Sequence, residues 1–222
     1  ESFFGLPLRK ETVYIGVGGM HKLPRHILDD SKATVQRGTR VTNIKKNDKG
    51  KWDVYGVSGK SAYHDTKEAD ARSSVEKMVG SFDVVLFTDV SSSFASWHRA
   101  SAGIPDSFLE KLPKRARIPL FSCMVALSHP IGETVGLDGI TVANGSKLWF
   151  AARSQSKPGF PKCKAECWTL ISTPAYAVDQ IRETSMRDPE TGEFRPQGND
   201  YLNSVPGPDL FEAFPDVVKP LS

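Results

Sequence analysis

The stretch from residue 14 to residue 28 constrains the chain most, because glycines separate two segments of different periodicity. Tyr14 to Val17 is aromatic and β-branched, which predicts a strand. The glycines at positions 16, 18 and 19 allow a tight turn or the close approach of a ligand, because glycine has no Cβ. Apolar residues then recur at helical spacing: Met20, Leu23, Ile27 and Leu28. The stretch therefore predicts a strand, a glycine turn and a helix.

A phosphate-binding dinucleotide loop is one interpretation of this turn, and it requires the pattern G-x-G-x-x-G at the start of a helix. Counted from Gly16, the third glycine would fall at position 21, which is His21. An acidic residue should follow about 20 positions on, but the segment there ends in Gln36, Arg37 and Gly38. The sequence therefore argues against a primary phosphate site, and a glycine turn between two packed elements remains the alternative.

Several runs taken together resemble the flavin amine-oxidase superfamily. Gly18-Gly19-Met20 and the run from Arg37 to Ile44 are similar to that family's G-G-M turn and its following G-T-x-V-x-x-I strand. The run from Phe82 to Thr88 resembles a family strand of the form aDxVvlt, and residues 91–97 resemble the helix behind it.

Within the superfamily, the renalase-like group is the most similar. Residues 149–159 resemble its w-x-A-R-x-S-S-K-P-G run, and residues 166–174 resemble its E-x-W-x-L-x-x-S-P strand. The resemblance covers most of residues 13–180. It implies a mixed α/β (α+β) fold: the substrate domain of a flavin amine-oxidase-like fold, with a mostly antiparallel sheet and flanking helices, plus part of the FAD-binding domain.

The resemblance also implies a set of site residues around FAD. The cofactor-side residues are Gly18, Gly19, Met20, Val41 and Thr88, and the substrate-side candidates are Trp149, Arg153, Lys157 and Trp168. Arg153 would suit an anionic or carbonyl group, as guanidinium groups do. The residues alone leave another interpretation open, in which the two tryptophans are sheet core and Arg153 is an ion-pair partner.

Family members also carry an N-terminal G-x-G-x-x-G unit and a C-terminal flavin-binding segment, and these 222 residues match neither. We therefore expect the chain as it stands to be a non-catalytic structural subunit of a larger assembly. The alternative is an FAD-dependent oxidoreductase that oxidises a reduced nicotinamide or an amine, with the phosphate loop supplied by a further segment. The expected partner is accordingly a larger protein assembly or the missing cofactor-domain segments.

Composition excludes several other classes. The formal net charge of +3 is small and dispersed, so nucleic acid is not an expected partner. No apolar run reaches the 18 or more residues of a membrane span, so we expect a soluble chain. Two alternatives stay open: peripheral association with a membrane, and an organellar location after removal of a targeting peptide. Cys123, Cys163 and Cys167 lack the partners of a zinc site, and the five histidines are scattered, so no metal and no catalytic residue is assigned.

Along the chain, the resemblance together with the residue pattern implies three regions. Residues 1–100 form a partial cofactor-domain-like region with the glycine turn, a hairpin over about 40–57 and a surface insertion over 58–80. Residues 101–186 form a substrate-domain-like part with sheet and helices, and residues 187–222 form a loop-rich tail. Beyond the hairpin, strands are expected at 33–36, 82–87, 119–127, 140–143, 147–152 and 166–172, and later helices at 90–97, 104–112 and 175–185.

Overall fold

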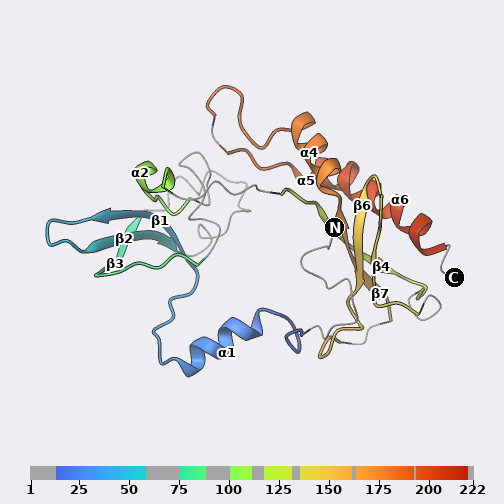
Figure 1. The fold of residues 1–222 in the computed structure, drawn as a ribbon, viewed down its shortest axis with the longest axis horizontal. Helices are drawn as coiled ribbons and strands as arrows, with labels where there is room; N and C mark the ends of the chain where they lie inside the picture. The colour runs from blue at the N-terminus through green and yellow to red at the C-terminus, as the bar shows by residue number, and fades with distance from the viewer. Residues whose placement is uncertain are drawn as a thin grey trace. The chain divides into compact units, whose positions relative to one another are not determined.

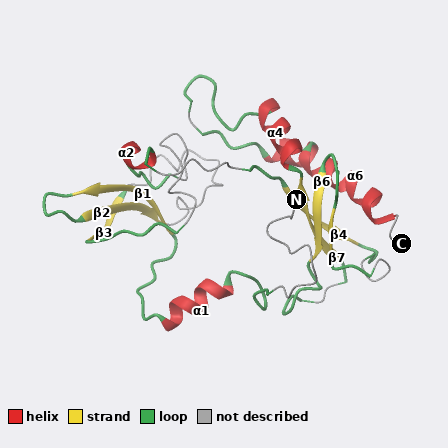
Figure 2. Cartoon of the chain, in the orientation of Figure 1, coloured by secondary structure: helices red, strands yellow, loops and turns green. Residues whose placement is uncertain are grey.

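The computed structural model describes residues 14–58, 76–88, 101–111, 118–131, 136–161, 164–192 and 194–219. It is a mixed α/β chain with antiparallel sheets and a few helices (Figures 1 and 2). Two compact units share the chain. The sheet–helix unit comprises residues 1–33, 117–186 and 197–222, and the meander unit comprises residues 34–116 and 187–196.

The sheet–helix unit contains a four-stranded antiparallel sheet in the order β4-β7-β6-β5. Its strands are β4 (Ser122–Leu127), β5 (Gly139–Thr141), β6 (Leu148–Arg153) and β7 (Glu166–Ser172). All four expected strands are confirmed, and β7 has the predicted bounds. Asn144, in the turn before β6, has a positive φ of 60°, which asparagine tolerates better than most residues.

The core of this unit lies between the sheet and α6 (Pro206–Val218), the helix coloured red in Figure 1. Strand β7 alternates strictly, and its inward residues Trp168 and Leu170 are fully buried. Leu210, Phe214 and Val218 recur four residues apart on α6 and are buried against the sheet. The rings of Trp168 and Phe214 lie 5.1 Å apart between centroids. Side chains on one face repeat every two residues along a strand and about every 3.6 residues along a helix. These repeats place the apolar residues of β7 and of α6 on one face of each element, and the two faces pack together.

The expectation of a loop-rich tail over 187–222 is wrong for residues 199–218, which form α5 (Asn199–Ser204) and α6. The prolines and glycines there suggested turns. Proline is tolerated in the first turn of a helix, however, because the N–H it lacks would have no acceptor there. Pro206 is such a residue, and the three buried apolar residues of α6 supply the packing that stabilises the helix.

Helix α4 (Pro174–Glu183) confirms the helix expected at 175–185. The Thr173 hydroxyl caps it by accepting a hydrogen bond from the backbone N–H of Tyr176 at 3.2 Å. Helix α5 is joined to α4 where the Tyr201 hydroxyl donates to Oε1 of Gln180 at 2.7 Å.

The meander unit is a three-stranded antiparallel sheet in the order β1-β2-β3. Strands β1 (Thr39–Lys46) and β2 (Trp52–Ser58) confirm the hairpin. Its turn is closed by Asn47, whose Oδ1 accepts hydrogen bonds from the backbone N–H groups of Lys49 and Lys51. The short helix α2 (Asp106–Leu109) lies within the helix expected from residue 104.

The third strand of this unit, β3 (Lys77–Phe82), corrects two expectations. Residues 77–80 belong to a strand rather than to a surface insertion, because they pair with the open edge of β2. The buried strand expected at 82–87 is absent: residues 83–88 have no strand structure, and Val84 and Leu86 are exposed. The apolar run at residues 82–87 does not alternate, and such a run does not show whether a neighbouring strand has a free edge with which it can pair.

Two shorter expected strands are also wrong. Residues 14–16, before the glycine turn, and residues 33–36 are irregular, since neither pairs with a neighbouring strand.

The helix after the glycine turn is confirmed as α1 (Lys22–Asp30). The helix expected at 90–97 and most of the 58–80 insertion lie outside the described residues, as does residue 112 of the helix expected at 104–112.

Truncation of the α6 core tests this packing. Leu210→Ala should lower the free energy of unfolding of the sheet–helix unit by about 2–5 kcal/mol, because it leaves a cavity where Leu210 is completely buried. Urea denaturation followed by circular dichroism measures it. The neighbouring Phe211→Ala is the control, since Phe211 is exposed and should cost about 1 kcal/mol or less. Equal losses would contradict the orientation of α6.

Candidate functional site

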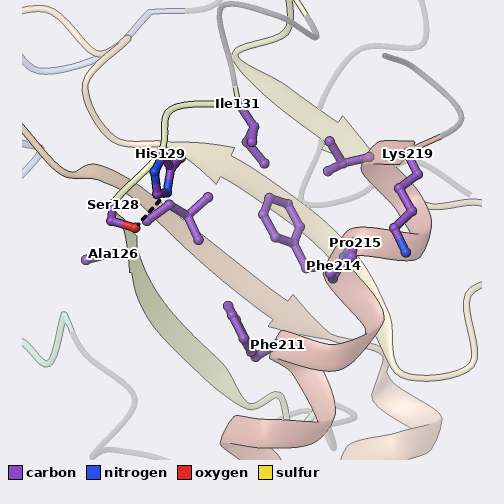
Figure 3. A pocket seen from close by; sticks show the side chains of 10 residues that line it. Ala126, Ser128, His129, Ile131, Phe211, Phe214, Pro215 and Lys219 are labelled. Atoms are coloured by element: carbon purple, nitrogen blue, oxygen red, sulfur yellow. Dashed lines mark hydrogen bonds between the residues drawn. The ribbon is translucent and has the colours of Figure 1, made fainter.

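An apolar pocket of about 500 Å³ lies between the C-terminal end of β4 and the second half of α6. Figure 3 shows its side chains around Phe214. The described residues that line it are Ala126, Leu127, Ser128, His129, Ile131, Phe211, Phe214, Pro215, Val218 and Lys219. Its volume is within the range of small-molecule sites, and its walls are mainly carbon with a few polar groups. We call it the β4–α6 pocket.

The wall of this pocket at Ile131 is fixed by a buried carboxylate. Glu166, only 6% exposed, accepts hydrogen bonds on Oε1 from the Trp168 indole at 2.7 Å and from the Ile131 backbone N–H at 3.1 Å. A buried carboxylate needs such partners, because desolvation penalises its charge. Glu166 therefore joins β7, the core tryptophan and the segment that follows β4.

Arg153 supplies the positive charge beside Glu166. One guanidinium nitrogen lies 3.5 Å from Oε2 of Glu166, and another lies 2.8 Å from Oδ1 of Asp138. The hydrogen bond to Asp138, with a smaller contribution from Glu166, raises the pKa of Arg153, although partial burial opposes this. Two carboxylates thus hold the guanidinium, and this geometry matches the ion-pair interpretation of Arg153.

A second polar group connects α6 to the sheet and to α4. Lys147 Nζ lies 2.6 Å from Oδ1 of Asp209, and the Tyr176 hydroxyl donates to Oδ2 of Asp209 at 2.7 Å. Partial burial opposes ionisation of Asp209, but these two hydrogen bonds and the charge of Lys147 lower its pKa. Burial, followed by the hydrogen bond to Asp209, raises the pKa of Tyr176. The phenol is therefore a stable donor rather than an acid–base group.

The meander unit has a cavity of its own, of about 410 Å³. Trp52 and Phe108 form an edge-to-face pair in its wall, with ring centroids 6.1 Å apart. Its remaining described lining residues are Ile44, Asp83, Val84, Val85, Phe87 and Ile104. Asp83, its one acidic group, is paired with Lys51 at 3.1 Å.

The predicted cofactor-side residues are divided between the two units: Gly18, Gly19 and Met20 lie in the sheet–helix unit, and Val41 and Thr88 lie in the meander unit. The backbone N–H of Gly18 donates to Pro158 O, and that of Gly19 donates to Gly16 O, both at 2.9 Å. Both glycines have positive φ, 73° and 119°, so the turn itself requires them.

The space beside these two glycines is filled by the chain. A Cβ at Gly19 would lie 2.7 Å from the His21 ring, and one at Gly18 would collide with the Lys22 side chain. In this arrangement both amides already have acceptors, and the ends of the exposed Lys22 and His21 side chains lie beside the two glycines.

The predicted substrate-side residues do not form one open wall. Trp168 is buried in the core, Trp149 is partly buried in β6, and Arg153 is held by its carboxylates. Lys157 lies over the Phe160 ring, 5.7 Å from its centroid. The run containing Lys157 does, however, contact the glycine turn through Pro158, so two separate runs of the family resemblance meet in space.

The described ranges contain neither a metal-ligand cluster nor a helix that could span a membrane. No group of three or more His, Cys, Asp or Glu side chains there is arranged to hold a metal ion. No described helix combines the length and the apolar composition that a bilayer span requires. Cys123 and Cys167 are free thiols, and burial raises the pKa of Cys123, which makes it a poor nucleophile.

The sequence reasoning did not identify the β4–α6 pocket, Glu166 as a buried carboxylate, or Asp209. The sequence did contain a signal for Glu166. It lies an even number of positions before Trp168 and Leu170 in an alternating strand, so its side chain is on the same inward face as theirs. Asp209 had no such signal, since its partner Lys147 is 62 positions away.

Comparison with known proteins adds no assignment: no family model matches the sequence, and no curated protein matches it either.

Removing the charge of Asp209 should weaken the attachment of α6. At pH 7, Asp209→Asn should lower the free energy of unfolding by about 1 kcal/mol, because a partly exposed charged hydrogen-bond group is lost. Because folding lowers the pKa of Asp209, its contribution is complete above the unfolded pKa of about 3.9 and is lost as the pH falls through the folded value.

Urea denaturation of wild type and Asp209→Asn at a series of pH values measures this dependence. The difference should be constant near neutral pH and should shrink below about pH 4. Glu212→Gln, an exposed carboxylate on the same helix, is the matched control. A difference that grows as the pH falls would contradict the assignment.

Proposed function

We propose that this chain is a module of the renalase-like, flavin amine-oxidase type that acts as a non-catalytic structural subunit of a larger protein assembly. The observation that carries the proposal is the exposed apolar face of α1. Met20, Leu23, Ile27 and Leu28 lie on one side of this helix and its preceding turn, and all four are exposed. Exposed contiguous apolar surface of this kind is typical of protein–protein contact sites.

The energetics of α1 support a partner for this face. The helix has nine residues and none of them is buried. Isolated helices shorter than about 12–15 residues are marginal in water, and most helices in proteins are stabilised by packing an apolar face. Its ion pairs, such as Arg25 with Asp29 at 3.7 Å, are exposed and contribute little. A docking partner would supply the missing burial.

The glycine turn before α1 favours the non-catalytic proposal over an FAD-binding one. Its Gly18 and Gly19 amides donate to carbonyls of this chain, and Lys22 and His21 fill the adjacent space. Two of the residues implied for the flavin side, Gly18 and Gly19, therefore have their amides engaged within the chain as they are arranged here.

The alternative is an FAD-dependent oxidoreductase acting on a reduced nicotinamide or an amine, with the phosphate loop supplied by another segment. One observation favours it: the hydrogen bond from Gly18 to Pro158 brings a cofactor-side run and a substrate-side run of the family resemblance together in space. FAD would then bind partly through residues outside this chain.

Disruption of the α1 face tests the structural-subunit proposal. The tagged chain, purified under native conditions from its own cells, should elute in size-exclusion chromatography with light scattering as part of a complex larger than the monomer. The double variant Leu23→Glu with Ile27→Glu should elute as a monomer, because two charges on side chains that are 51% and 59% exposed in the free chain would be buried in the interface.

Arg25→Glu is the matched control, because it changes the net charge by the same amount on the polar side of α1. It should leave the elution position unchanged. A wild-type chain that elutes as a monomer, or a control that dissociates equally, would contradict a structural role for the apolar face.

The visible absorbance of the natively purified chain separates the two functions. We expect a colourless protein that gains no bound flavin when FAD is added and excess FAD is removed by gel filtration. A flavin spectrum near one equivalent per chain, bleached by reduced nicotinamide or by an amine, would favour the oxidoreductase instead.

A further inference from the structure

The β4–α6 pocket combines an apolar interior with hydrogen-bond donors at its rim. Phe211, Phe214 and Val218 supply aromatic and branched apolar surface from α6, and Leu127 and Ile131 supply it from the end of β4 and beyond. No carboxylate is present among the ten described residues that line it. The charged group among these ten residues is the Lys219 ammonium, and its charge favours an anion over a cation.

The Ser128–His129 pair leaves a donor available in either tautomer. Ser128 Oγ and His129 Nδ1 lie 3.0 Å apart, and either atom can donate. If the hydroxyl donates, the imidazole keeps an N–H at Nε2; if Nδ1–H donates, the hydroxyl proton is available. One donor of this pair can therefore serve a ligand in both cases. Figure 3 shows the pair across Phe214 from Lys219.

The floor of the pocket is packed into the core of the unit. Phe214 is 2% exposed and packs on the Trp168 ring, and the backbone of Ile131 is held by Glu166. A preformed apolar floor reduces the ordering cost of binding. Phe211 remains half exposed beside it, which leaves an entrance along α6.

From this geometry we propose that the β4–α6 pocket binds an amphipathic carboxylate of the medium-chain fatty acid class. The acyl chain lies over Phe211, Phe214 and Val218. The carboxylate accepts a hydrogen bond from the Ser128–His129 pair, and Lys219 supplies the positive field. This small-molecule site is separate from the apolar face of α1 and does not depend on a protein partner.

Isothermal titration calorimetry of the full chain with decanoate tests the proposal, and decyltrimethylammonium is the comparison ligand of similar chain length and opposite charge. Decanoate should bind with one equivalent per chain, and the cation should bind at least about tenfold more weakly, a difference of about 1.4 kcal/mol. His129→Phe, which keeps the ring and removes its donors, should weaken decanoate binding about two- to fivefold.

Phe211→Asp should abolish decanoate binding, because it places a carboxylate in the pocket. Val178→Asp is the matched control: Val178 on α4 is 43% exposed and Phe211 is 45% exposed, but only Phe211 lines the pocket. The control should bind decanoate as wild type does. Absence of decanoate binding, equal affinity for the cation, or equal loss in both aspartate variants would overturn the proposal.

Discussion

The packing of α6 on the sheet is the interaction on which the sheet–helix unit depends. Phe214 on Trp168, with Leu210 and Val218 on either side, forms the core of this unit together with strands β6 and β7. The same helix forms one wall of the β4–α6 pocket. Because Phe214 is both a core residue and the pocket floor, the position of that floor is determined by the fold.

Two carboxylates, one buried and one partly buried, connect this core to the neighbouring segments by hydrogen bonds. Glu166 connects the core tryptophan to the chain after β4, and Asp209 connects the first turn of α6 to Lys147 and Tyr176. Hydrophobic packing alone allows a helix to slide or rotate on a sheet, whereas hydrogen-bonded carboxylates accept few geometries. Glu166 and Asp209 therefore fix the position of the elements that they connect.

The sequence predicted the elements whose signals are local. The Asn47 turn, the alternation of β7 and the Thr173 cap each lie within a few residues of the element they specify. The elements it missed depend on distant partners. Strand β3 forms because β2 has an open edge, and α6 forms because the sheet offers an apolar face to residues that resemble a loop by their proline content.

The candidate site followed the same rule. Trp168 was expected either on a substrate wall or in the sheet core, and only the register of β7 against α6 placed it in the core. Arg153 was expected to hold a ligand or a carboxylate, and its partners, Asp138 and Glu166, lie 15 and 13 residues away in sequence. The pocket itself requires the end of β4 to meet α6, about 85 residues later, so no local pattern could have identified it.

The glycine turn and α1 differ in what they leave exposed, and this difference is the reason for proposing that the chain binds a protein partner. In the glycine turn, the Gly18 and Gly19 amides already have acceptors, while the apolar side chains of the following helix are all exposed. A cofactor site presents the opposite balance, with open polar donors above an apolar pocket. Apolar surface is stabilised by any complementary apolar surface, whereas a flavin requires specific donors at specific positions. This contrast is the basis for proposing a protein partner at residues 16–28, and the small-molecule site is proposed instead at the β4–α6 pocket, where the Ser128–His129 pair supplies a donor.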